Sequence, residues 1–452
     1  MNLLWIGCLV ASLSVTEIPI GTELQYTGTL SPQSKSGQGN TGADDKTFAV
    51  TAVAISDSDG APQLAWNLEE RGGGSWTWPE RFGAIAVAPN GKPNSPVLRL
   101  LQTHDAVPHP VAIRSPLFES LDKLAPDASW SDGRLEFRVA RKRRVKDRDC
   151  WQVEVVSNQG RSQSLLVDAS TGILVSLEQR VFMGRGDEYQ LKMELQSQKV
   201  LSGADVDKTQ TAFTSLRRLQ GALERTGEQK VVEPTPPQLK AAQGMIAPIE
   251  RQAEGTMWAK LTAIIARDLV QQERRLEGAA GLAKKFIGQV APKSTLKFAD
   301  GTTISTSDLQ GKVAVLHFWE YRNENLAEPY GQTGYLDFLN GKRKKLGVKV
   351  IGVNVDPRIA DRDNSAAAVR SMKKLQEFMN LAYDVAIDDG TVLGHFGDPR
   401  SLGSPLPLWI VIGPDGKINH YHVGFYNITP DEGLKELDEA VIAALRKQRE
   451  AK

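Results

Sequence analysis

The chain has 452 residues, of which 40% are hydrophobic and 24% are charged. A chain of this length is too long to fold around one ordinary hydrophobic core. Because domains usually have about 100–200 residues, we expect two or three folded units. The 55 basic and 54 acidic residues leave a formal net charge of +1, which excludes the global field that favours nucleic acid or an anionic membrane surface. We therefore expect no nucleic-acid partner, and any partner must be recognised by local features.

The N-terminal segment is apolar from Leu3 to about Val15. It is shorter than the roughly 20 residues of a membrane-spanning helix and has the length of a signal-peptide core. No Lys or Arg precedes it, so an uncleaved anchor and an ordinary buried strand remain alternatives. We expect residues 1–21 to be a signal peptide and the mature protein to be periplasmic or secreted. Membrane contact is expected only through this segment, where it is not cleaved.

The sequence contains two cysteines, Cys8 and Cys150. Because Cys8 lies in the expected signal peptide, the mature protein would keep one thiol and could not form an internal disulfide. Cys150 shares strand parity with Gln152 and Glu154, which predicts that it faces solvent. The mixed charges around it predict no strongly lowered pKa. A disulfide between two chains through Cys150 remains an alternative.

Residues 22–203 are expected to form an antiparallel β domain. Segments rich in β-branched and aromatic residues, separated by Gly, Asp, Asn and Pro, include ELQYTGTL, KTFAVTAVAI, RLEFRVARKRRV, CWQVEVVS and EYQLKMELQSQKV. In CWQVEVV the apolar Trp151, Val153 and Val155 alternate with polar residues, the period of a strand with one solvated face. The run SLLVDASTGILVSLEQ indicates a hairpin that turns between Asp168 and Gly172.

This order of a strand, a VDASTG turn and further long strands resembles the half-barrel of LolA-type lipoprotein carriers and related periplasmic sheet domains. The resemblance implies that the N-terminal sheet binds an apolar ligand such as a lipid or a lipoprotein.

Residues 204–288 are expected to form a helical connector. In DKTQTAFTSLRRLQGALERTG the apolar residues Phe213, Leu216, Leu219 and Leu223 recur at three- and four-residue spacing. EPTPPQ follows as a stiff linker, and two further amphipathic stretches come after it. The connector is expected to pack on its neighbours, and recruitment of a partner by its polar face is the alternative.

Residues 289–452 alternate strand and helix patterns. The strands VAVLHFW, VKVIGVNVD and PLWIVI are separated by helical segments, and a closing hairpin turns at GPDGK. Such alternation implies an α/β domain whose sheet has parallel pairs covered by helices, with an antiparallel pair at one edge. The whole chain is therefore expected to be multidomain, with the β domain, the helical connector and this α/β domain in order.

The pair Ala291-Pro292 and the segments LQGKVAVLHFW, KVIGVNVD and SPLPLWIVIGPDGKI resemble the thioredoxin-like fold. The similarity is to the TlpA/ResA and alkyl hydroperoxide reductase (redoxin) group of envelope proteins. It implies that Pro407 is held cis opposite the active site and exposes a backbone edge to a substrate chain. X-Pro bonds are the ones in which the cis form costs little.

The departure from this family lies at its reactive residues. Family members carry two cysteines separated by two residues after the FW of the central strand, and these positions fall on Asn323 and Leu326. Neither residue forms a thiolate, and a peroxidatic cysteine is likewise absent, since no cysteine follows Cys150. Asn323 suits a helix N-cap, with Glu324 in the first turn. We expect a recognition edge made by Trp319, Glu320, Tyr321, Arg322, Leu406 and Pro407.

The six histidines show no convincing ligand spacing, and we expect neither a metal nor another cofactor. His420 and His422 lie two apart on an expected strand and point the same way, which favours a half-exposed strand face over a metal pair. His317 lies in an apolar central strand and is expected to be a satisfied core residue.

Two further segments have ordinary structural explanations. RVARKRRVKDRD is the densest basic run; it fits an exposed hairpin tip, and contact with an anionic lipid or polymer is the alternative. RGGGSWTWPERFG lacks the strand-to-helix setting and the lysine of a phosphate loop. Its Trp76 and Trp78 are expected to pack in the β core.

Three functional hypotheses remain. The preferred one is an exported protein whose redox-inactive thioredoxin-like domain binds a protein or peptide partner, as a module for binding or scaffolding in the cell envelope. The second is a redoxin-class thiol-disulfide oxidoreductase or antioxidant protein that uses a partner's thiol or Cys150. The third is a LolA-like carrier of a lipid or lipoprotein. Under the first hypothesis we do not expect the protein to be an enzyme; under the second it would be a thioredoxin-like oxidoreductase.

Overall fold

The computed structural model describes residues 18–33, 45–57, 60–71, 78, 81–87, 93–94, 98–104, 107–157, 162–184, 186–223, 234–321, 332–428 and 431–450. The chain divides into two compact units. The first consists of residues 1–223 and 242–266, and the second of residues 224–241 and 267–452. Within the described ranges, no helix combines the length and the hydropathy needed to cross a membrane.

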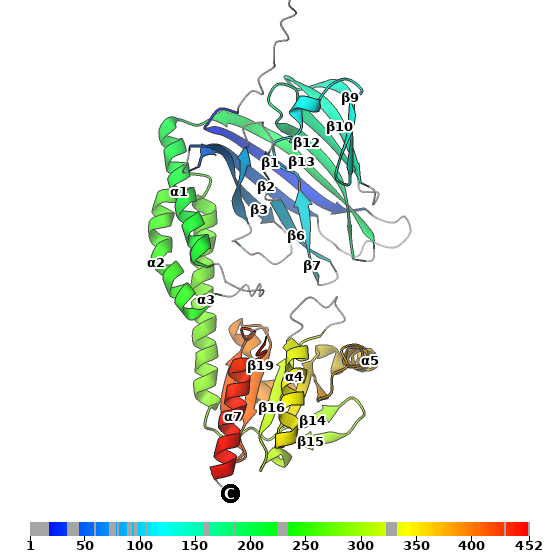
Figure 1. Ribbon diagram of the computed structural model, residues 1–452, viewed down its shortest axis with the longest axis vertical. Coiled ribbons are helices and arrows are strands. Elements are labelled where there is room, and N and C mark those ends of the chain that lie inside the picture. The colour runs from blue at the N-terminus through cyan, green and yellow to red at the C-terminus, as the bar shows by residue number, and fades with distance from the viewer. Residues whose placement is uncertain are drawn as a thin grey trace, which may run out of the picture. The chain divides into compact units, whose positions relative to one another are not determined.

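The first unit is built on an eleven-stranded antiparallel sheet, drawn in blue to green in Figure 1. Its strand order is β5-β4-β3-β2-β1-β13-β12-β11-β10-β9-β8, and β6 pairs with β7 in a separate two-stranded sheet. The strands are β1 (Thr22–Pro32), β2 (Lys46–Ser56), β3 (Pro62–Arg71), β4 (Phe82–Val87), β5 (Pro93–Asn94), β6 (Leu98–His104), β7 (Val107–Ile113), β8 (Ser129–Asp132), β9 (Leu135–Val145), β10 (Arg148–Ser157), β11 (Ser162–Asp168), β12 (Leu174–Met183) and β13 (Asp187–Val200).

The predicted alternation of apolar and polar residues places one face of this sheet in a hydrophobic core. Trp151, Val153 and Val155 of β10 all lie in that core, as expected. Residues of the β6–β7 pair join the same core. Trp78 is buried as predicted, whereas Trp76 lies outside the described residues.

The predicted VDASTG turn is confirmed between β11 and β12. The carboxylate of Asp168 accepts hydrogen bonds from the backbone N–H groups of Ser170 (2.9 Å) and Thr171 (3.0 Å). Gly172 closes the turn with φ +71°, a conformation that glycine adopts without strain. The local polar bonds of the turn therefore fix the register of the hairpin.

The prediction that Cys150 faces solvent is wrong. Cys150 is opposite Arg143 on one neighbouring strand and Asp168 on the other. Arg148 donates to Asp168 (3.0 Å) and to Gln198 (2.8 Å), so long polar side chains lie on this face of the sheet. The thiol is free and fully buried. Burial and the Asp168 carboxylate raise its pKa, against the smaller opposing effect of Arg148.

Three helices follow the large sheet: α1 (Gly203–Ala222), α2 (Pro236–Ala253) and α3 (Ala259–Phe286). Ser202 caps α1 by accepting a hydrogen bond from the backbone N–H of Asp205. Trp258 is fully buried, stacks on Phe213 of α1 and contacts Phe82 of β4 edge to face. Boundaries between the two units fall within α2, after Ala241, and within α3, after Ala266.

The second unit is built on a seven-stranded mixed sheet of order β15-β14-β18-β17-β16-β19-β20. β16, β17 and β18 are parallel to one another, and β19 and β20 add an antiparallel edge, as the sequence predicts. The elements are β14 (Thr295–Phe298), β15 (Thr303–Ser305), β16 (Ala314–Trp319), α4 (Thr333–Arg343), β17 (Lys349–Val355), α5 (Arg362–Phe378), β18 (Asp384–Asp388), α6 (Thr391–His395), β19 (Leu408–Ile412), β20 (Ile418–Val423) and α7 (Lys435–Glu450).

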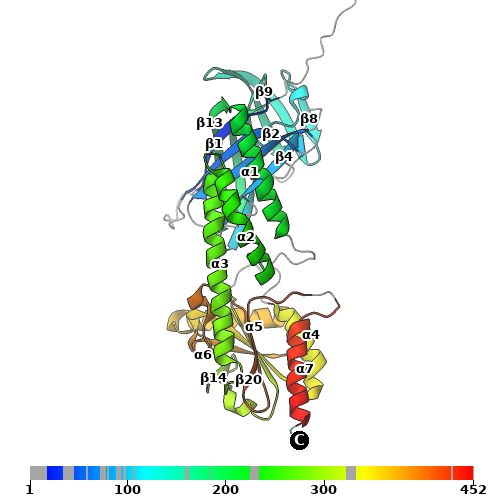
Figure 2. The same ribbon diagram turned by 90° about the vertical axis from the view of Figure 1, so that its left-hand side faces the viewer.

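Helices cover both faces of this sheet, so β16 is buried along its whole length. One core joins the sheet to α4, α5 and α7, and the other joins it to α6 and the last turn of α3. Figure 2 shows α4 and α7 on one side of the sheet and α6 on the other. Alternate residues of β16 enter the two cores, Phe318 one and Trp319 the other. Residues that follow Trp319 therefore emerge at the edge where the parallel strands end.

Candidate functional site

The candidate site lies at the carboxyl end of β16. There β17 runs parallel on one side, with Asn354 beside Trp319. On the other side β19 runs antiparallel, with Leu408 beside Phe318. The Leu406-Pro407 peptide bond that precedes β19 is cis, as predicted. The carbonyl of Pro407 accepts a hydrogen bond from the backbone N–H of Gly424 (2.8 Å), so the cis-proline segment is held beside the end of the central strand.

The structure separates the expected recognition edge into buried and exposed residues. The side chains of Trp319, Leu406 and Pro407 are buried. Glu320 is exposed and Tyr321 is partly exposed, so these two side chains are available to a partner. Arg322 and the two positions that match the family's cysteines, Asn323 and Leu326, lie outside the described residues.

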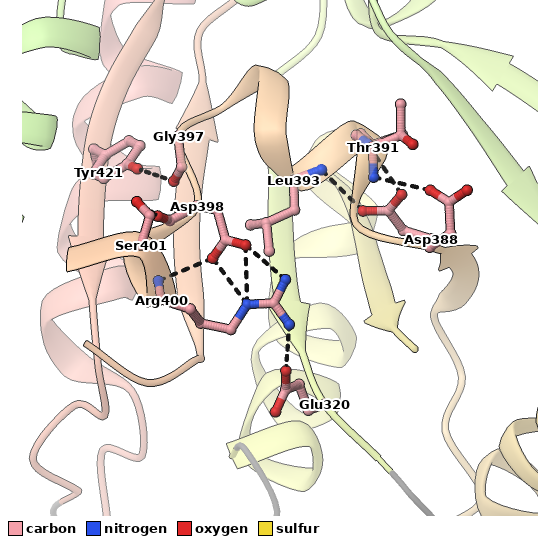
Figure 3. Close-up of polar contacts among 11 residues, drawn as sticks. Glu320, Asp388, Thr391, Leu393, Gly397, Asp398, Arg400, Ser401 and Tyr421 are labelled. Atoms are coloured by element: carbon pink, nitrogen blue, oxygen red, sulfur yellow. Dashed lines mark hydrogen bonds and ion pairs between the residues drawn. The ribbon is translucent and has the colours of Figure 1, made fainter. Parts of the chain in front are cut away.

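Glu320 belongs to a charged cluster that sequence reasoning missed. Its carboxylate accepts a hydrogen bond from Nη1 of Arg400 at 2.5 Å (Figure 3). The same guanidinium donates from Nε and Nη2 to both carboxylate oxygens of Asp398, at 2.7–3.0 Å. The hydrogen bonds that Arg400 donates to Asp398, and then to Glu320, raise the pKa of Arg400 well above its usual range despite partial burial. Burial acts to raise the pKa of Asp398, but the bonds from Arg400 outweigh it and lower that pKa.

The segment that carries Arg400 is fixed by its neighbours. The hydroxyl of Tyr421 on β20 donates to the carbonyls of Phe396 (2.9 Å) and Gly397 (3.1 Å). The buried carboxylate of Asp388, at the end of β18, accepts from the backbone N–H groups of Val392 and Leu393 (Figure 3). Strands β18 and β20 therefore position the short helix α6 and the turn after it, and Arg400 reaches Glu320 from that turn.

A second turn of the same sequence lies on the other side of β16. Asp356-Pro357-Arg358 follows β17, just as Asp398-Pro399-Arg400 precedes the cis-proline segment. In both turns the arginine donates its backbone N–H, Nε and Nη2 to the aspartate two residues before it. Bonding to Asp356 raises the pKa of Arg358, and Tyr321 adds to the same shift. Glu320 thus bonds one of the two oriented guanidinium groups, and Tyr321 interacts electrostatically with the other.

Aromatic rings pack behind this edge on neighbouring strands. His317 stacks on Trp409 with ring centroids 3.7 Å apart, and Tyr426 follows at 5.4 Å from Trp409. His317 is fully buried, which confirms its predicted place in the core; that its ring nitrogens are satisfied stays a prediction. His422 stacks on Tyr426 at 4.1 Å, and His420 bonds the Tyr426 hydroxyl through Nε2 (2.7 Å).

His420 and His422 point the same way, as predicted, with their rings 6.3 Å apart and nearly parallel. Burial, and then the neighbouring His420, lower the pKa of His422 to about 4. Burial also lowers the pKa of His420. Across the part of the chain that the structure describes, no group of three His, Cys, Asp or Glu residues is arranged to hold a metal ion.

The start of α4 is tied to the loop after β20. The buried Gln332 precedes α4 and has φ +65°. Its side-chain amide donates to the backbone carbonyl of Tyr426 (2.7 Å) and accepts from the backbone N–H of Tyr426 (3.0 Å). These two hydrogen bonds to the backbone of one residue hold the first turn of α4 at the same edge as Glu320.

Comparison with known proteins places the C-terminal region in a class. Residues 287–421 match the model of the AhpC/TSA family, and this part of the chain is a thioredoxin-like domain of the redoxin type. Over 134 residues the chain is 31% identical to thiol-disulfide oxidoreductase ResA of Bacillus subtilis (strain 168), a match that covers 29% of this chain. The chain spans 64% of the length of that curated relative.

Solved structures with a similar fold include two bacterial proteins. A putative thiol:disulfide interchange protein DsbE from Chlorobium tepidum is 26% identical, with a TM-score of 0.27, over 35% of this chain and 97% of that one. A putative protein disulfide isomerase from Bacteroides thetaiotaomicron is 18% identical, with a TM-score of 0.29, over 36% of this chain and 93% of that one.

Proposed function

We propose that the thioredoxin-like domain binds an extended segment of a protein partner at the edge formed by Glu320, Tyr321 and the cis-proline segment, without thiol chemistry of its own. One observation carries the proposal. The region that matches the AhpC/TSA family contains no cysteine, since Cys8 and Cys150 are the two cysteines of the chain.

The geometry supports binding rather than exchange of electrons. A thiolate is the attacking species in disulfide exchange, and neither oriented arginine nor Glu320 can take that role. Arg358 and Arg400 are held by their own aspartates, which lowers the entropy cost of ordering them against a ligand. The partly exposed ring of Tyr321 interacts with Arg358 and offers apolar contact area with few rotatable bonds. We propose a location in the cell envelope for this function, with export by the N-terminal segment.

The test uses a thiol-free probe, the insulin B chain with both cysteines carboxymethylated and a fluorescein label. Fluorescence anisotropy should show saturable binding to the full chain. Tyr321→Ala should weaken binding about tenfold, a loss of about 1.4 kcal/mol. Phe378→Ala is the matched control, because this exposed aromatic residue lies at the far end of α5 and outside the proposed edge. Equal weakening by both variants, or no binding, would refute the proposal.

A second candidate function is thiol-disulfide oxidoreduction with a thiol supplied by a partner, and the match to a thiol-disulfide oxidoreductase favours it. Cys150 is a poor candidate for the missing thiol, because it is buried and its pKa is raised. Insulin-disulfide reduction by the purified chain, with Cys150→Ser as the control, tests whether Cys150 nevertheless supplies that thiol. Turnover that disappears in the variant would overturn the binding proposal.

The third hypothesis, an apolar ligand in the N-terminal sheet, stays a prediction. Native mass spectrometry of the full chain after mild extraction tests it. A lipid-sized mass adduct is expected if the sheet carries a ligand, and a chain that is consistently free of adducts would contradict the hypothesis.

A further inference from the structure

Strand β9 continues past its outer neighbour. β8 pairs with β9 over residues 135–138, and one more bond joins the N–H of Val139 to the carbonyl of Ala128. β10 pairs with the inner edge of β9 up to Val145. Among the described strands, none pairs with the outer edge of residues 140–145. This length of edge corresponds to about 20 Å of extended chain.

The unpaired part of β9 carries four consecutive cations. Arg141, Lys142, Arg143 and Arg144 are all exposed, so the strand no longer has one buried face here. The register between β9 and β10 shifts by one residue before this run, and Lys142 then lies opposite Trp151 and Arg143 opposite Cys150. Because Trp151 belongs to the core face, successive cations point to the two opposite faces of the sheet.

These cations are not neutralised by their own hairpin. Lys142 lies 4.8 Å above the ring of Trp151, and Nη1 of Arg143 contacts the amide oxygen of Gln152 at 3.5 Å. Arg148 carries the ion pair to Asp168; in the described part of the chain, none of the four cations forms an ion pair. Residues 141–149 contain six Lys or Arg and two Asp, a net charge of +4.

We propose that the outer edge of β9 at residues 140–145 takes up an extended acidic polypeptide segment as an additional strand. The edge offers backbone N–H and C=O groups to a further chain, the usual basis of strand addition. Because every second side chain of a strand lies on the same face, acidic side chains that alternate along the added strand would meet either Lys142 and Arg144 or Arg141 and Arg143.

Charge also decides which strands are excluded. Two copies of this edge repel each other, so the cations oppose pairing between copies of the chain while they favour an acidic segment. A planar anionic surface is a poorer match, because cations that point to opposite faces of a strand cannot all approach one plane. An acidic strand approaches the edge itself and meets the two cations on the face that its acidic side chains share.

The first experiment measures binding of a fluorescein-labelled peptide of six Glu-Val repeats to the full chain by anisotropy. Saturable binding that weakens as NaCl rises from 50 to 300 mM is expected. The double variant Lys142→Glu/Arg144→Glu should weaken it at least about tenfold. The matched control is Arg217→Glu/Arg218→Glu, the same charge change at exposed positions of α1, and it should leave binding within about twofold of the unmodified chain. Equal weakening by both double variants would overturn the proposal.

The second experiment separates strand addition from attraction by charge alone. The same peptide with proline in place of three valines keeps its charge but loses backbone donors. It should bind at least about fivefold more weakly, and hydrogen exchange at residues 140–145 should slow with the Glu-Val peptide. Equal binding of the two peptides overturns the proposal. So does binding to vesicles with 30% phosphatidylglycerol in the absence of binding to the peptide.

Discussion

Glu320 and Arg400 lie 80 residues apart in the sequence and meet at 2.5 Å at the edge where β16 ends. Glu320 is the first residue after the central strand, and Arg400 precedes the cis-proline segment. Their contact joins the two parts of the chain that border the proposed binding edge, and Asp398 orients the arginine from behind. The contact should therefore matter for the shape of the edge more than for the stability of the whole domain.

Arg400→Gln should lower the free energy of unfolding by about 1 kcal/mol, because the pair is partly exposed and solvent weakens it. Urea unfolding followed by tryptophan fluorescence measures this value. Arg362→Gln, at an exposed position in the first turn of α5, is the control and should change stability by less than about 0.5 kcal/mol. An Arg400 variant as stable as the control would contradict the role given to the cluster.

Acid should destabilise the C-terminal domain through His422. Its folded-state pKa of about 4 lies below the usual 6.5, so the unfolded chain binds more protons between these values. Stability is therefore expected to rise with pH from about 4 to about 6.5, and to fall on acidification, by at most about 3 kcal/mol for this residue. Burial also lowers the pKa of the neighbouring His420, so protonation of this residue should likewise destabilise the folded domain in acid.

The comparison is the unfolding free energy of the unmodified chain and of His422→Gln at intervals from pH 4 to pH 7.5. The variant should show the shallower dependence on pH in the acidic half of this range. Parallel curves for the two proteins would show that protonation of His422 is not the cause.

Replacing either of two glycines by alanine should change the stability of the protein, in opposite directions for the two positions. A Cβ on Gly28 of β1 would lie 2.2 Å from Cζ of Phe48 and 2.5 Å from the carbonyl oxygen of Lys192, so Gly28→Ala should cost about 2–3 kcal/mol. Gly244 is exposed in α2 and a Cβ there meets nothing within 4 Å. Gly244→Ala should stabilise the helix by about 0.5–1 kcal/mol. Thermal unfolding of both variants checks the pair, and a stable Gly28→Ala protein would contradict the packing of β1 on β2.

Cys150 should react slowly with thiol reagents in the folded protein. The measurement is the rate of reaction with Ellman's reagent in a Cys8→Ser variant, before and after addition of guanidinium chloride. Reaction should be at least about 100-fold slower in the folded state, because the thiol is buried and its pKa is raised. Reaction at the rate of the unfolded chain would contradict the burial of Cys150.

Much of the architecture follows from local patterns. The alternation in CWQVEVV, the VDASTG turn and the order of strands and helices after Gln289 each depend on neighbours in the sequence, and the structure confirms them. The cis peptide bond at Pro407 was predicted by resemblance.

The errors and omissions come from contacts that are distant in sequence. Cys150 is buried on the face that its strand parity indicates as solvated, because Arg148 joins Asp168 and Gln198 on that face. The Glu320–Arg400 contact depends on the path of the chain through β18 and α6. The repeated Asp-Pro-Arg triplet was a visible signal of both arginine turns, since aspartate caps a short turn and proline starts it.

The burial of Cys150 has a consequence for how the protein responds to reductants and oxidants. The described part of the chain contains no disulfide that a reductant could break. The free thiol of Cys150 is buried on a sheet face that carries polar side chains. Shape and surface should then be the same in oxidising and reducing surroundings. If the proposed function holds, the binding edge should retain its partner with the same affinity in the presence and absence of a thiol reductant.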